Sequence, residues 1–115
     1  MALQYKDKTV YFTTKPVVFQ FEIGDLLELD DCVVVRLSIP ADNETRRNVF
    51  AMQKDAKLIW QIESSLKKYP EINVELPYEN ISLLENGNVS VSDFFGRTFE
   101  VDIKNGKLIN FKVAR

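Results

Sequence analysis

The side chains best suited to chemistry in this chain are carboxylates. They gather around one predicted turn and its flanking strand, at Glu22, Asp25, Glu28, Asp30 and Asp31. Carboxylates bind hard cations and act as general acids and bases, but this spacing matches no calcium-binding loop. The simplest interpretation is a solvated acidic turn. The functional alternative is that Glu28, Asp30 and Asp31 form a patch that receives a basic partner.

A second candidate set combines two adjacent arginines with the sole tryptophan. Arg46 and Arg47 lie in a polar loop, where guanidinium groups could hold a phosphate or a carboxylate. Trp60 could stack on a sugar ring or anchor a partner. The structural alternative is a solvated loop and a core tryptophan, because Trp60 alternates with Leu58 and Ile62.

Phe94 and Phe95 are adjacent aromatic residues in a predicted turn that ends at Gly96. Neighbouring side chains at a turn point in different directions, so both do not readily fit one core. An exposed phenylalanine marks a contact surface. We therefore group Phe94 and Phe95 with the acidic turn as candidate partner-binding residues.

Nucleophilic and cofactor chemistry find little support. The chain has no His and one Cys, so it can form no Ser-His-Asp triad, Cys-based zinc site or internal disulfide. Cys32 opens a run of valines, which predicts a buried thiol. Phosphate loops and dinucleotide fingerprints are absent. We predict a non-enzyme without catalytic residues, metal or cofactor; an enzyme built on paired carboxylates is the third-ranked alternative.

The dominant pattern in the chain is apolar–polar alternation with a period of two, which is typical of β-strands. It runs through residues 17–23 and again through 33–39, where both faces are apolar and predict a central strand. Asn86-Gly87 and Asn105-Gly106 are hairpin signals. Short connections favour an all-β antiparallel meander of about eight or nine short strands.

Residues 55–70 are ambiguous because their apolar spacing also fits one face of a helix. We predict a strand through Glu63, followed by a short helix near 64–69 that Pro70 ends. A full helix over residues 55–69 is the alternative.

An internal repeat predicts two blade-like units, at roughly residues 9–63 and 80–115, joined by a crossover at 64–79. Lys-Leu-Ile recurs at an offset of 50, whereas the alternation aligns better at 49 and superposes Trp60 on Ile109. We expect the alternation to hold, because a slip of one residue inverts a strand. The units would form a bent sheet or a small barrel within one domain, residues 1–115.

The hairpin from Val49-Phe50-Ala51-Met52 to Lys57-Leu58-Ile59-Trp60 resembles the repeat of quinoprotein-type β-propellers. In that repeat a glycine stands where this chain has Ala56, and the second copy has Asn110 in place of the tryptophan. Because two units do not close a propeller, the resemblance implies hairpin geometry and not a quinone cofactor. The chain also resembles small uncharacterised bacterial β-proteins, and proteins of similar size and class include bacterial immunity proteins against toxins.

The composition and charge of the chain bear on its location and its partners. The chain has 115 residues, of which 45% are hydrophobic, and a net charge of −2. We expect a cytoplasmic protein with no membrane partner, because no signal-like or membrane-spanning apolar run occurs. The slight acidity argues against nucleic acid. An open sheet edge would allow homo-oligomers.

The function we expect is a non-enzymatic protein-interaction module with a basic protein partner, an immunity or inhibitor protein being its sharpest version. The alternative is a small-ligand or carbohydrate-binding β-domain.

Overall fold

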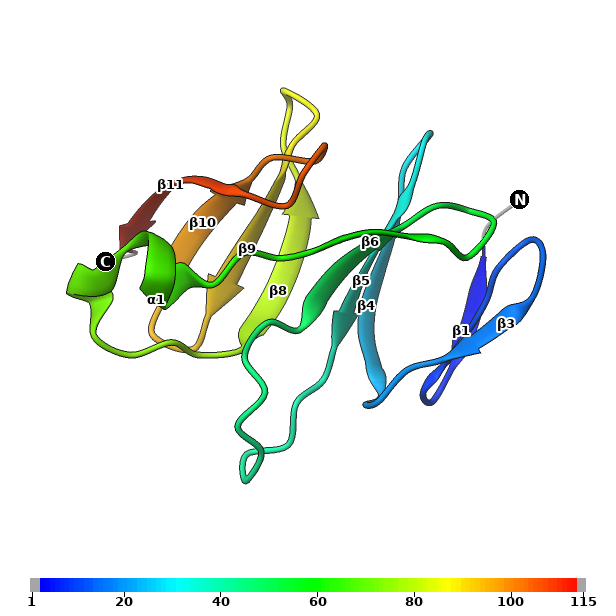
Figure 1. The fold of residues 1–115 in the computed structure, drawn as a ribbon, viewed down its shortest axis with the longest axis horizontal. Helices are drawn as coiled ribbons and strands as arrows, with labels where there is room; N and C mark the ends of the chain where they lie inside the picture. The colour runs from blue at the N-terminus through cyan, green and yellow to red at the C-terminus, as the bar shows by residue number, and fades with distance from the viewer. Residues whose placement is uncertain (1–2, 114–115) are drawn as a thin grey trace.

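Three antiparallel meanders follow one another along the chain in a computed structural model that describes residues 3–113 (Figure 1). Sheet 1 contains β1 (Gln4–Lys6), β2 (Thr9–Tyr11) and β3 (Pro16–Val18). Sheet 2 contains β4 (Ile23–Glu28), β5 (Val33–Leu37), β6 (Val49–Met52) and β7 (Leu58–Gln61). Sheet 3 contains β8 (Tyr78–Leu83), β9 (Val89–Asp93), β10 (Arg97–Val101) and β11 (Leu108–Val113).

Sheet 2 is the middle layer and buries both of its faces. The alternating side chains of β5 explain this: Val33 and Val35 pack toward sheet 1, and Val34 packs toward sheet 3, all with no exposed surface. One hydrophobic cluster joins sheets 1 and 2, and a second joins sheets 2 and 3. The prediction of a central strand at 33–39 is confirmed.

The all-β antiparallel meander is confirmed, but its subdivision differs from the prediction. Eleven strands form three sheets instead of eight or nine strands in two units, and the strands within residues 3–113 form no closed barrel. The strand predicted at 17–23 is split, because residues 19–22 carry the chain from sheet 1 to sheet 2. The alternation continues through the break because Val17, Phe19 and Ile23 all pack in the cluster between these sheets.

The ambiguous segment contains β7 and then a short helix, α1 (Ser65–Lys68), followed by a 3-10 turn, η1 (Pro70–Ile72). The short-helix prediction is therefore confirmed and the full helix over 55–69 is wrong. Neither helix described within residues 3–113 has the length and apolarity needed to cross a membrane.

The internal repeat is real at the level of hairpins, but the expected alignment is wrong in its second strand. In both hairpins a bulge skips one residue: Met52 pairs with Leu58, and Val101 pairs with Leu108. The first strands therefore align at an offset of 49 and the second strands at 50, so Trp60 corresponds to Asn110 and not to Ile109. The extra residue lies in the turn of the second hairpin, which keeps each side chain on its proper face.

Candidate functional site

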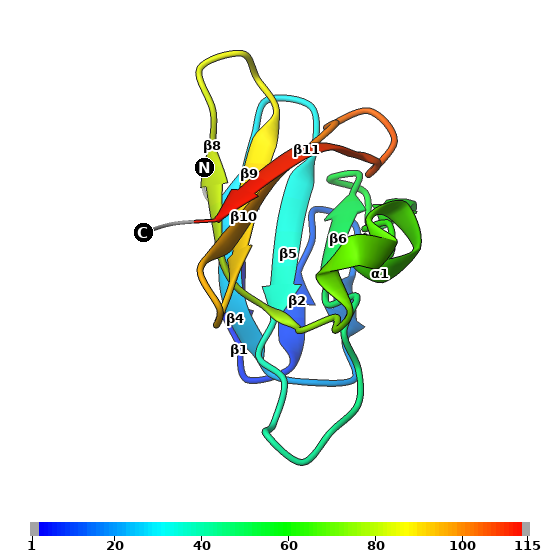
Figure 2. The same ribbon diagram turned by 90° about the vertical axis from the view of Figure 1, so that its left-hand side faces the viewer.

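The predicted acidic turn forms one wall of an open groove, which we call the acidic groove. The β4–β5 turn supplies this wall, and the β8–β9 turn of sheet 3 lies opposite, both at the same end of the molecule (Figures 1 and 2). The groove has a volume of about 410 Å³ and is lined by Glu28, Leu29, Asp30, Asp31, Cys32, Leu83, Gly87 and Ile103. The sequence placed the acidic residues at a turn, but the apolar wall opposite comes from the next sheet.

The three acidic residues predicted for partner binding have different roles in the groove. Glu28 is used within the fold, because one oxygen accepts a hydrogen bond from the Leu3 amide at 2.7 Å and the other lies 3.8 Å from the Lys54 ammonium. Asp30 and Asp31 are exposed, and neither side chain has a hydrogen-bond or ion-pair partner within residues 3–113. Their charges are therefore available to a partner.

The inner surface of the groove is apolar, and its one thiol has low reactivity. Cys32 is buried, and burial, followed by the nearby charge of Asp31, raises the pKa of its thiol although Lys54 opposes the shift. A protonated, buried thiol is a poor nucleophile. Leu83 is half exposed at the opposite wall, so the groove combines free carboxylates with apolar surface.

The turn between β9 and β10 displays the two aromatic candidates at the opposite end of sheet 3. Phe94 is 80% exposed and Phe95 is 57% exposed. The Asp93 carboxylate holds the turn by accepting hydrogen bonds from the amides of Phe95 at 3.0 Å and Arg97 at 3.1 Å. The candidate partner-binding residues therefore form two separate surfaces instead of one.

A buried ion pair beneath this turn was not predicted from the sequence. The Arg97 Nε atom donates to Asp93 Oδ2 at 2.7 Å, and both side chains are almost fully buried. The Arg97 guanidinium also lies 5.6 Å from the centre of the Phe95 ring, within the range of a cation–π contact. An aspartate that opens a turn ending in Gly-Arg is the signal that could have revealed the pair.

The structure does not bring Arg46, Arg47 and Trp60 into one site. Arg46 donates to the Glu75 carbonyl at 2.9 Å, and Arg47 donates to the Ile62 carbonyl at 2.7 Å. The two arginines line different surface depressions. Trp60 lies buried between sheets 2 and 3, where its indole N–H donates to the Ile103 carbonyl at 2.8 Å.

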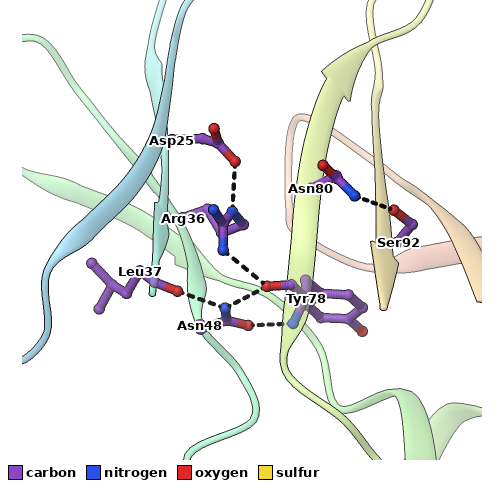
Figure 3. Close-up of polar contacts among 7 residues, drawn as sticks. All are labelled: Asp25, Arg36, Leu37, Asn48, Tyr78, Asn80 and Ser92. Atoms are coloured by element: carbon purple, nitrogen blue, oxygen red, sulfur yellow. Dashed lines mark hydrogen bonds and ion pairs between the residues drawn. The ribbon is translucent and has the colours of Figure 1, made fainter. Parts of the chain in front are cut away.

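A polar joint between sheet 2 and β8 was also missed (Figure 3). Arg36 pairs with Asp25 at 2.6 Å and donates to the Tyr78 carbonyl at 3.3 Å. The Asn48 amide donates to the carbonyls of Leu37 at 2.8 Å and Tyr78 at 2.9 Å, and its oxygen accepts from the Tyr78 amide at 2.9 Å. These hydrogen bonds join sheet 2 to β8, so we assign the joint a structural role.

Other features that carry chemistry are sparse within residues 3–113. No group of three or more Cys, Asp and Glu side chains there could hold a metal ion. Burial is the largest influence on the Tyr78 hydroxyl and raises its pKa, so this group stays protonated at neutral pH.

Comparison with known proteins adds a family to this geometry. The chain matches no curated protein and no solved structure. The resemblance to quinoprotein-type propellers therefore rests on the hairpin residues alone. A family model with the description "Domain of unknown function (DUF7957)" matches residues 1–113. Because this match spans nearly the whole chain, the protein belongs to the DUF7957 family.

Proposed function

We propose that this protein is a non-enzymatic interaction module that binds a basic protein partner in the acidic groove. The observation that carries the proposal is the pair of exposed carboxylates that bind no side chain or backbone group of residues 3–113, Asp30 and Asp31, beside the half-exposed Leu83 in one open groove. Free charge next to accessible apolar surface is the combination that protein interfaces use.

The two parts of the groove would contribute differently to binding. The carboxylates would steer a basic partner and select its orientation, since complementary charge acts on association rate and specificity. The apolar lining from Leu29, Leu83 and Ile103 would supply the hydrophobic contact. A partner segment with a lysine or arginine beside an aliphatic side chain fits both parts.

The sharpest version of this proposal is an immunity or inhibitor-type protein that covers a basic site on a toxin or enzyme. Its support is the small size of the chain, its net charge of −2 and the free acidic turn. The bacterial and cytoplasmic setting of this version rests on the sequence features described above. The alternative of a small-ligand or carbohydrate-binding domain has less support, because its three candidate residues lie apart and are used within the fold.

Charge reversal tests the groove directly. The variant Asp30→Lys/Asp31→Lys changes two exposed residues, so its stability should stay within about 0.5 kcal/mol of the wild type. Affinity capture from lysate of the source organism, with elution by increasing salt, should retain one basic protein on the wild type. We expect the variant to bind it at least about tenfold more weakly, because attraction becomes repulsion.

The control for this experiment is Asp42→Lys/Glu44→Lys, which makes the same charge change at exposed positions outside the acidic groove. This control should retain the partner. Equal capture by the groove variant and the wild type would exclude the acidic groove as the binding surface. If the wild type captures nothing, the interaction proposal loses its support and a ligand screen by thermal shift follows.

A further inference from the structure

The strand β11 is an open edge of sheet 3. It pairs with β10 from Val113 back to Leu108, and within residues 3–113 no other hydrogen bond reaches the backbone of residues 109–113. Figure 2 shows β11 in front of the rest of the sheet, at its outer margin. An open edge presents unpaired N–H and C=O groups that another strand can join.

The remaining edges offer less to a second strand. β8, the other edge of sheet 3, and β4, a six-residue edge of sheet 2, lie against each other. The amide and carbonyl of the first residue of β8, Tyr78, are also bound by Asn48. The edge strands of sheet 1 have three residues each, and β7 has four. β11 has six, so it offers the longest accessible ladder.

The side chains of β11 are self-complementary. Ile109 is 47% exposed and Val113 is 53% exposed, on either side of the half-buried Phe111. We infer that two copies of this chain pair through β11, antiparallel, about a two-fold axis at Phe111. In this register Asn110 of each copy lies opposite Lys112 of the other, and Ile109, the residue that the bulge in the pairing with β10 skips, lies at the level of Val113.

Neighbouring registers are less favourable. An axis at Lys112 places the two lysines directly opposite each other, and like charges in that position destabilise a sheet. An axis at Asn110 places Leu108 opposite Lys112. Leu108 faces the core opposite Val101, whereas Lys112 pairs with the outward Thr98, so their faces disagree. The axis at Phe111 is selected because Asn110 and Lys112, which it places opposite each other, both pair with outward residues of β10, Glu100 and Thr98.

The pairing would close after two copies. It would join the two four-stranded sheets into one of eight strands, whose outer edges are the two copies of β8. Since β8 lies against β4 in each copy, further strands would not add readily. A symmetric contact of this kind forms a dimer and not a fibre.

The oligomeric state tests this inference. We expect the mass measured by light scattering or sedimentation to rise from 13.3 kDa to twice that value as concentration increases from about 1 µM to about 1 mM, the range for a modest interface. Ile109→Lys/Val113→Lys should stay monomeric over this range, with the circular dichroism and cooperative unfolding of the wild type. If the double variant does not fold, Val113→Lys alone serves.

The controls place the same substitution at other exposed edges: Val18→Lys in β3 and Leu58→Lys in β7. Both should dimerise like the wild type. In hydrogen exchange, those amides of residues 109–113 that point away from β10 should be protected at high concentration and exposed on dilution, whereas the amides that pair with β10 should stay protected throughout. A wild type that stays monomeric to about 1 mM, or loss of the dimer in a control instead of the β11 variant, would overturn the inference.

The acidic-groove variant Asp30→Lys/Asp31→Lys serves as an independent reference, because it lies outside β11. It should dimerise normally. The dimer and the proposed binding function can therefore fail separately.

Discussion

The Asn48 side chain forms hydrogen bonds with backbone groups, as a neighbouring strand would. It is fully buried, and its amide group serves the N–H and C=O of Tyr78 and the C=O of Leu37 (Figure 3). These backbone groups belong to two different sheets. Three hydrogen bonds are lost without Asn48, and only the Tyr78 C=O keeps a second side-chain donor, Arg36 at 3.3 Å. An unpaired buried polar group costs about 1–3 kcal/mol.

Replacing Asn48 by Ala should therefore lower the free energy of unfolding by at least about 3 kcal/mol, because several backbone partners are lost at once. Urea denaturation measures this loss. The matched control is Asn80→Ala, which removes an exposed amide whose Nδ2 atom bonds Ser92 at 3.2 Å and should change stability by no more than about 0.5 kcal/mol. Equal losses in the two variants would contradict the role of Asn48.

At the scale of elements, α1 depends on a carboxylate that lies outside it. Its four residues are too few to form a stable helix alone. Glu75 Oε1 accepts hydrogen bonds from Ser64 Oγ at 2.6 Å and the Leu66 amide at 2.9 Å, while the Ser64 side chain caps the helix. The burial of Glu75 acts to raise its pKa, but the hydrogen bonds outweigh burial and lower the pKa below its usual 4.5.

This shift predicts a pH dependence with a defined sign. A carboxyl group whose folded pKa is lowered contributes stability above its unfolded pKa, and that stability is lost as pH falls through the folded value. Glu75→Gln should cost on the order of 1 kcal/mol at pH 7, and the difference from wild type should shrink below pH 4.5. Thermal unfolding at several pH values measures it.

The control for this pH series is Glu71→Gln, at an exposed residue whose side chain makes no hydrogen bond within residues 3–113. Its stability should follow that of the wild type at every pH. A Glu75→Gln deficit that stays constant down to pH 3 would show that the carboxylate charge does not hold α1.

At the scale of the whole molecule, the chain is a stack of three sheets. The outer face of sheet 3, which points away from sheet 2, is exposed to solvent. Ala51 and Trp60 of sheet 2 pack against sheet 3. Their counterparts in sheet 3, Glu100 and Asn110, are polar and lie within hydrogen-bond distance of each other at 3.3 Å. The second repeat has no tryptophan at this place, and within residues 3–113 no further sheet covers the position.

Two glycines in turns of sheet 3 should differ in the stability they lose on substitution by alanine. Gly87 and Gly106 both have positive φ, of 90° and 76°. A Cβ at Gly106 would lie 2.7 Å from Trp60 Cδ2, whereas a Cβ at Gly87 meets nothing within 4 Å. Gly87→Ala should lower the free energy of unfolding by about 1 kcal/mol because of backbone strain. Gly106→Ala should lower it by about 2 kcal/mol more, because the new methyl group overpacks the contact with Trp60.

Chemical denaturation followed by the fluorescence of the single tryptophan measures both variants. Only Gly106→Ala should also shift the native emission, because its new methyl group displaces Trp60. Equal costs and an unchanged native spectrum would show that Gly106 does not lie against the indole.

The local features of this protein can be predicted from short stretches of its sequence. The all-β class, the central strand β5, the short helix after β7 and the turns at Gly87 and Gly106 follow from alternation and turn chemistry. These signals depend on neighbouring residues and survive without knowledge of the partners.

The grouping of those features became visible only in the tertiary structure. It divided the strand predicted at 17–23 between two sheets and directed Arg46 and Arg47 to backbone carbonyls. It also placed Asp31, in sheet 2, across the acidic groove from the β8–β9 turn, whereas Phe94 lies at the other end of sheet 3. The physical reason is that each outcome depends on contacts between residues far apart in the chain. Alternation specifies which side chains of a strand are buried, but not which sheet buries them.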